Sequence, residues 1–85
     1  MDRAELVPST ARLPDVFADR VPESEREGLR SMAEGGEWGE LLDLLVAILL
    51  QTRAKVSPAE RDLLQDVLAG WGLPTSQLDA LVVSH

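Results

Sequence analysis

The chain has 85 residues, enough for a single domain around one small hydrophobic core. Fifteen acidic and eight basic residues leave a net charge of −7, which argues against binding to nucleic acid or to an anionic membrane surface. The absence of cysteine excludes a disulfide framework, a thiolate nucleophile and a cysteine metal site, and the only histidine is the last residue, His85.

The N-terminal segment shows no regular apolar pattern. Pro8, Ser9 and Pro14 interrupt any helical periodicity. We therefore predict a poorly specified, extended arm over residues 1–13 and a helical bundle domain over residues 14–85. A short helix is expected to begin at Pro14 and to stop before Pro22.

A second helix is predicted to begin at Pro22, because proline followed by acids suits the positive end of a helix dipole. Its apolar residues, Leu29, Met32 and Ala33, form one narrow stripe and leave a wide acidic face. Gly35 and Gly36 are expected to end it.

A third helix is predicted from about Glu37 to Gln51. Leucine, valine and isoleucine cover most of its circumference, which is typical of a helix at the centre of a domain. One polar stripe remains, at steps of three, four and four: Glu40, Asp43, Ala47 and Gln51. We expect this stripe to meet solvent or a partner.

The longest apolar run, Leu44 to Leu50, is too short for a membrane span, which needs about 20 apolar residues. The N-terminus carries Asp2 and Glu5 where a signal peptide would be basic. The expected location is therefore the cytoplasm.

The fourth helix has the clearest start signal, because Ser57, Pro58 and Glu60 match a capping box with proline at the first helical position. Gly70 and Gly72, on either side of Trp71, are expected to end it. A short final element is expected from Thr75. The sequence thus predicts an all-α, single-domain bundle of three main helices with short terminal helices.

Several kinds of chemistry find little support. The carboxylates of Glu37, Glu40 and Asp43 would need a cleft to act as acid and base, and the chain contains neither a calcium-loop motif nor a Glu-x-x-His pair. A phosphate bound before the third helix would be repelled by the carboxylate of Glu37. Acyl carriers attach their phosphopantetheine group to a serine that directly follows an aspartate, and this sequence contains no Asp-Ser pair. We expect no enzyme, no cofactor and no metal.

Charge points instead to a protein partner. Residues 15–43 carry nine acidic and three basic side chains, so this third of the chain holds −6 of the net −7. Such a field steers a basic partner and speeds its association, although it can also serve only solubility. Trp38, beside these acids, is a candidate interface anchor, with core packing as the alternative.

The segments Glu34–Leu45, Val56–Leu64 and Gly70–Leu73 together resemble the small helical immunity proteins of polymorphic toxin systems, the MafI type. The resemblance covers about half of the chain and lies in a glycine turn, a leucine-rich helix and a capping box; Gly36 is an extra glycine relative to the family's turn. It implies neutralisation of a cognate toxin by tight, non-catalytic binding. Because binding residues in such systems diverge with the toxin, the resemblance assigns no contacts.

The leading hypothesis is an immunity protein that binds a cognate toxin with a basic surface, and is itself a monomer or weak homodimer when free. The alternative is a small acidic adaptor or regulatory module that docks on another basic protein. The candidate partner-binding residues are Glu23, Glu27, Glu34, Glu37, Trp38, Glu40 and Asp43.

Overall fold

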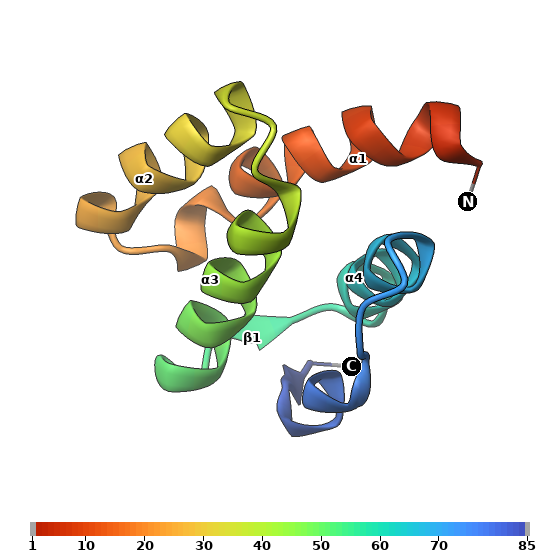
Figure 1. Ribbon diagram of the computed structural model, residues 1–85. Coiled ribbons are helices and arrows are strands. Elements are labelled where there is room, and N and C mark those ends of the chain that lie inside the picture. The colour runs from red at the N-terminus through yellow and green to blue at the C-terminus, as the bar shows by residue number, and fades with distance from the viewer. Residues whose placement is uncertain (1, 85) are drawn as a thin grey trace.

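The computed structural model describes residues 2–84 and shows a mostly helical protein (Figure 1). Its helices are α1 (Arg3–Val16), α2 (Glu23–Glu34), α3 (Trp38–Gln51) and α4 (Pro58–Gly70). Two 3-10 segments, η1 (Ala18–Arg20) and η2 (Ser76–Ala80), and two short strands, β1 (Lys55–Val56) and β2 (Val82–Val83), complete the described chain. The all-α prediction is confirmed in outline, with four helices in place of three main ones.

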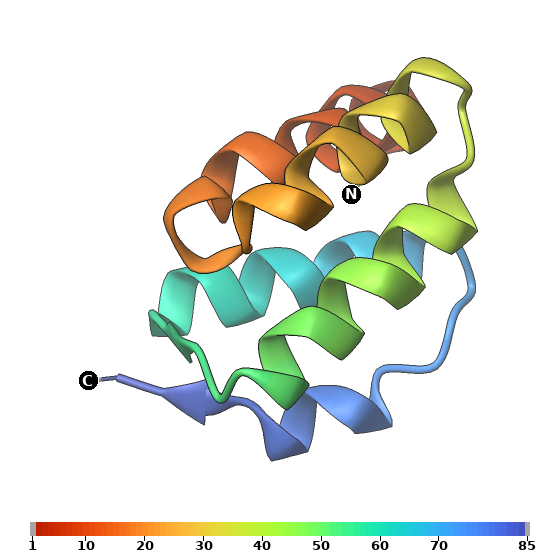
Figure 2. The same cartoon turned by 90° about the vertical axis from the view of Figure 1, so that its left-hand side faces the viewer.

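Helix α3 lies against the other elements through most of its circumference. Its buried side chains are Leu41, Leu42, Leu45, Val46, Ile48 and Leu49. Each such side chain stabilises the fold by about 1.5–3 kcal/mol when it leaves water. In Figure 2, α2 and α3 lie on the near side of the molecule with α1 and α4 behind them. The predicted central position of this helix is consistent with that burial.

The prediction of an extended N-terminal arm was wrong, because residues within it form most of α1. Leu6, Thr10, Leu13 and Phe17 follow one another at helical spacing, and all four are buried. Pro8 and Pro14 both lie inside the helix, where each removes one backbone hydrogen bond. Burial of the apolar stripe outweighs this loss, so the short separate helix expected from Pro14 is instead the last turn of α1.

Three helices end in the same hydrogen-bonding pattern, in which the backbone turns into the left-handed region one residue past the cap. After α2 the left-handed residue is Gly36, with φ of 70°, and after α4 it is Gly72, with φ of 72°. After α3 it is Arg53, with φ of 52°. Ala54 N–H then donates to the Leu49 carbonyl at 3.1 Å, which closes the turn.

A two-stranded parallel pair joins the segment after α3 to the end of the described chain. Lys55 pairs with Val82 and Val56 with Val83, and Ser84 N–H donates to the Val56 carbonyl at 2.8 Å. These strands were not predicted from the sequence, because two residues are too few to show the alternation of apolar and polar side chains that indicates a strand. They tie the chain beyond η2 to the centre, where Val56 is buried.

One charged pair connects elements that are far apart in sequence. The Arg20 guanidinium donates to both carboxylate oxygens of Glu60, at the start of α4. It also donates to the carbonyls of Val16 at 3.0 Å and Lys55 at 3.2 Å, and it lies over the Phe17 ring. Arg20 therefore holds α1, β1 and α4 together at one point.

Glu60 serves two purposes in this arrangement. It completes the predicted capping box, since its carboxylate accepts from Ser57 N–H at 2.8 Å while its own N–H donates to Ser57 Oγ at 3.1 Å. The hydrogen bond from Arg20, assisted by that from Ser57 and opposed by partial burial, lowers the pKa of Glu60 from 4.5 to about 2. The same bond raises the pKa of Arg20.

We expect Glu60→Gln to lower the free energy of unfolding at neutral pH by about 1–3 kcal/mol, because Arg20 loses its charged acceptor. Since the folded-state pKa of Glu60 lies below its ordinary value, its contribution is complete above pH 4.5 and is lost as the pH falls toward 2. Urea unfolding across this pH range should therefore show the gap between wild type and variant closing as acidity increases.

Asp62→Asn is the matched control, since Asp62 is exposed on the same helix. It should change stability by no more than about 0.5 kcal/mol. A Glu60→Gln loss that stays constant from neutral to acidic pH would show that the charge of Glu60 does not stabilise the fold.

Candidate functional site

The predicted partner-binding residues lie on two consecutive helices and the turn between them. Glu23, Glu27 and Glu34 lie on α2. Glu37 is the N-cap of α3, and Trp38, Glu40 and Asp43 lie in the first two turns of that helix. All six carboxylates are exposed, and Trp38 is half-buried. Within residues 2–84 none of the six forms an ion pair. We call these six side chains the acidic surface.

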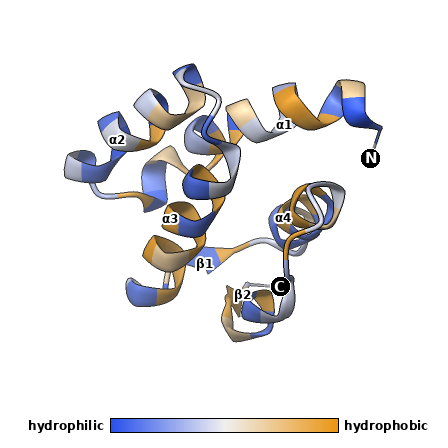
Figure 3. Ribbon diagram, viewed as in Figure 1, coloured by the Kyte–Doolittle hydropathy of each residue, from blue (hydrophilic) through white to orange (hydrophobic). Residues whose placement is uncertain are grey.

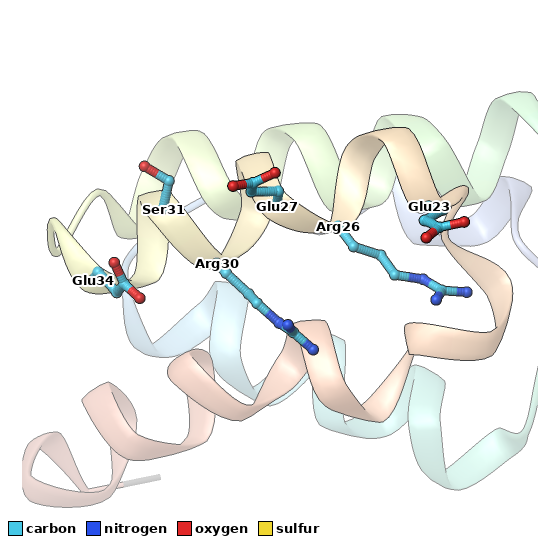
Figure 4. Close-up of a pocket in the computed structure, with 6 residues that line it drawn as sticks. All are labelled: Glu23, Arg26, Glu27, Arg30, Ser31 and Glu34. Carbon is cyan, nitrogen blue, oxygen red and sulfur yellow. The ribbon is translucent and has the colours of Figure 1, made fainter.

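On α2 the acidic surface is mixed with basic groups. Glu23, Glu27 and Glu34 line a groove of about 540 Å³ together with Arg26, Arg30 and Ser31 (Figure 4). Glu23, Glu27, Ser31 and Glu34 lie on the side of the helix away from the buried Leu29, whereas Arg26 and Arg30 flank that residue. Three carboxylates and two guanidinium groups leave the groove only weakly negative.

The two arginines of this groove point toward the preceding segment of the chain, as Figure 4 shows. Arg26 Nε donates to the Val21 carbonyl at 3.1 Å, and Arg30 Nη2 lies 3.9 Å from Asp15 Oδ1. Glu27 projects to the other side of α2. The groove thus has a basic side toward α1 and an acidic side away from it.

The sequence analysis did not include Arg26 and Arg30 among the site residues. The signal was present, since positions three and seven after Glu23 share its helical face. Counting charge along the chain, rather than around the helix, hid the fact that these bases lie among the acids.

On α3 the acidic surface continues without interleaved bases. Glu40, Asp43 and Gln51 of the predicted polar stripe are exposed, whereas Ala47 is half-buried. In Figure 3 the hydrophilic colour on this helix lies near its start and at its C-terminal end, with a hydrophobic stretch between them. The part of the surface formed by Glu37, Glu40 and Asp43 is therefore more purely negative than the part on α2.

Trp38 is held by a second tryptophan. Its ring stacks on that of Trp71, with centroids 6.4 Å apart and planes inclined by 18°. Trp71 Nε1 donates to Thr10 Oγ1 at 2.9 Å, and this fully buried hydroxyl donates to the Leu6 carbonyl at 2.6 Å. Trp38 therefore packs partly into the core while a portion of its ring remains at the surface beside Glu37.

The described residues contain no group of three or more His, Asp or Glu side chains arranged to hold a metal ion. Between Asp2 and Ser84, no helix is long and apolar enough to cross a membrane. His85 lies outside the described residues. What the acidic surface offers chemically is a set of free carboxylates that can accept hydrogen bonds from lysine or arginine.

Comparisons with protein families, with curated proteins and with solved structures find no match to this chain.

Thr10→Val is expected to lower the free energy of unfolding by about 1–3 kcal/mol, because Trp71 Nε1 would lose its acceptor in a partly buried position. Thr10→Ser keeps the hydroxyl and should lose less. Tryptophan fluorescence during urea unfolding measures both variants. A loss in Thr10→Ser with none in Thr10→Val would assign the effect to packing of the methyl group rather than to the hydrogen bond.

Proposed function

We propose that this protein is an immunity protein that neutralises a cognate toxin by binding it through the acidic surface. The observation that carries the proposal is the set of six exposed carboxylates on α2 and α3 that have no ion-pair partner among the described residues. The resemblance of the glycine turn, leucine-rich helix and capping box to MafI-type immunity proteins supports the same function.

Charge explains how such binding would work. Carboxylates at the rim of an interface steer a basic partner and raise the association rate. At about 0.1 M salt this attraction is largely screened at separations beyond about 10 Å. Glu37, Glu40 and Asp43 suit this purpose best, because no base lies between them on the helix. On α2, Arg26 and Arg30 would restrict the partner to one that also offers acceptors.

Trp38 supplies the aromatic anchor that slows dissociation, which charged side chains at the rim do not provide. A half-buried aromatic side chain already ordered by stacking loses little conformational freedom on binding, and such residues often dominate the dissociation rate. The proposed interface is therefore an aromatic anchor with carboxylates around it.

The test is growth rescue. The protein encoded by the neighbouring reading frame is expressed in a bacterial host, where it should arrest growth, and co-expression of this chain should restore growth. Glu37→Lys with Glu40→Lys should abolish rescue and weaken binding of the purified toxin by at least about tenfold, because charge repulsion replaces attraction.

Asp62→Lys with Asp66→Lys on α4 is the matched control, since it makes the same change in net charge at exposed positions elsewhere. It should rescue growth as wild type does. Rescue by the Glu37/Glu40 variant would disprove the site, and failure of wild type to protect would disprove immunity toward that protein.

The alternative function, an adaptor that docks on a basic regulatory protein, predicts a different result. Capture from the native lysate would then retain regulators that dissociate at high salt and no toxin. A toxin domain held through the high-salt wash would reject the adaptor function.

A further inference from the structure

A second groove lies at the end of α3 remote from Trp38, about 20 Å along the helix. It has a volume of about 340 Å³ and is lined by Leu49, Leu50, Arg53, Ala80 and Val82. Val82 exposes 39% of its surface, and only Val7 among the other large apolar side chains in residues 2–84 is also classed as exposed. No residue of this groove belongs to the acidic surface.

Arg53, at the edge of this groove, adopts a strained backbone conformation. Its φ of 52° falls in the left-handed region, where a side chain is disfavoured, and the equivalent positions after α2 and α4 are both glycine. Within residues 2–84 the Arg53 side chain has neither a hydrogen bond nor an ion pair. The fold therefore gains nothing visible from an arginine at this position, and backbone strain of this kind is often associated with function.

Strand β2 borders the same groove and has an unpaired edge. It pairs with β1 alone in a two-stranded sheet, and the other side of β1 is occupied where Arg20 donates to the Lys55 carbonyl. No backbone hydrogen bond reaches the outer edge of β2 from elsewhere in the described chain. An extended segment placed along this edge could form backbone hydrogen bonds with β2 and place side chains in the groove.

We propose that this groove binds an extended peptide segment of a partner protein, one that carries an apolar side chain next to a carboxylate. The apolar side chain packs against Leu50, Ala80 and Val82, and the carboxylate is bound by Arg53. A guanidinium holds a carboxylate through two parallel hydrogen bonds, which gives both affinity and orientation. The charge of the groove favours this partner, since Arg53 is the one charged residue that lines it and is a cation in a chain of net charge −7.

This site is independent of the proposed function, because it uses different residues and the opposite charge. A phage-displayed library of random linear peptides, selected on the wild-type protein, tests it. The expected result is enrichment of peptides in which aspartate or glutamate neighbours leucine, isoleucine or valine. Arg53→Gly and Val82→Ser should each weaken the Kd of the enriched peptide by at least about tenfold.

Arg53→Gly also separates binding from folding. Glycine relieves the left-handed strain, so its Tm should equal or exceed that of wild type while binding is lost. Lys55→Gln, an exposed cation that does not line the groove, should leave the Kd within about twofold of wild type. On peptide addition, the amide NMR signals that shift should be those of residues 80–83.

The proposal is overturned by failure of any peptide to enrich, by enriched peptides without an acidic residue, or by unchanged binding to Arg53→Gly. Shifts confined to α2 and the start of α3 would also reject it. Sedimentation provides a further test, since self-association abolished by Val82→Ser would make a second copy, rather than a peptide, the occupant of the groove.

Discussion

A helix that is apolar around most of its circumference must be covered from several sides, and α3 imposes this requirement on the whole chain. Six of its side chains are buried. No single neighbouring helix can cover so wide a surface, because each contributes only a narrow stripe. Helices α1 and α2 pack against it, and η2 covers a further part. The remaining elements are arranged around α3 because leaving any of its apolar face in water would cost more than ordering a loop to cover it.

Two polar connections then hold the first part of the chain to α4. Arg20 reaches Glu60, 40 residues away, and Trp71 reaches Thr10, 61 residues away. Apolar packing is non-directional and tolerates sliding, whereas a forked guanidinium–carboxylate pair and an indole hydrogen bond have narrow geometries. They lie toward opposite ends of α4, so together they define its orientation relative to α1. The positions of Trp38 and of the β1–β2 pair depend on that orientation.

The surface left over after this packing has two electrically distinct parts. Glu37, Glu40 and Asp43 project from the exposed side of α3 because its other sides are buried. On α2 the guanidinium groups of Arg26 and Arg30 are directed to Val21 and Asp15, toward α1. At the other end of α3, Arg53 lines a groove together with Val82, an exposed apolar side chain. The acidic surface and the Arg53 groove would therefore attract partners of opposite charge, which would allow one small domain to hold two different segments.

The sequence by itself determined the parts that depend on neighbouring residues. The capping box at Ser57, the glycine turn after α2 and the apolar character of α3 are local, so the ends of three helices and the exposed positions of Glu40 and Asp43 could be predicted from it. Only the tertiary structure decided the rest. Residues 3–16 are helical because Leu6, Leu13 and Phe17 find a core to enter, which outweighs two prolines that argue locally against a helix. The Arg20–Glu60 pair, the Trp38–Trp71 stack and the β1–β2 pairing each join residues tens of positions apart. No local pattern records such contacts, because they exist only once the hydrophobic core has brought those segments together.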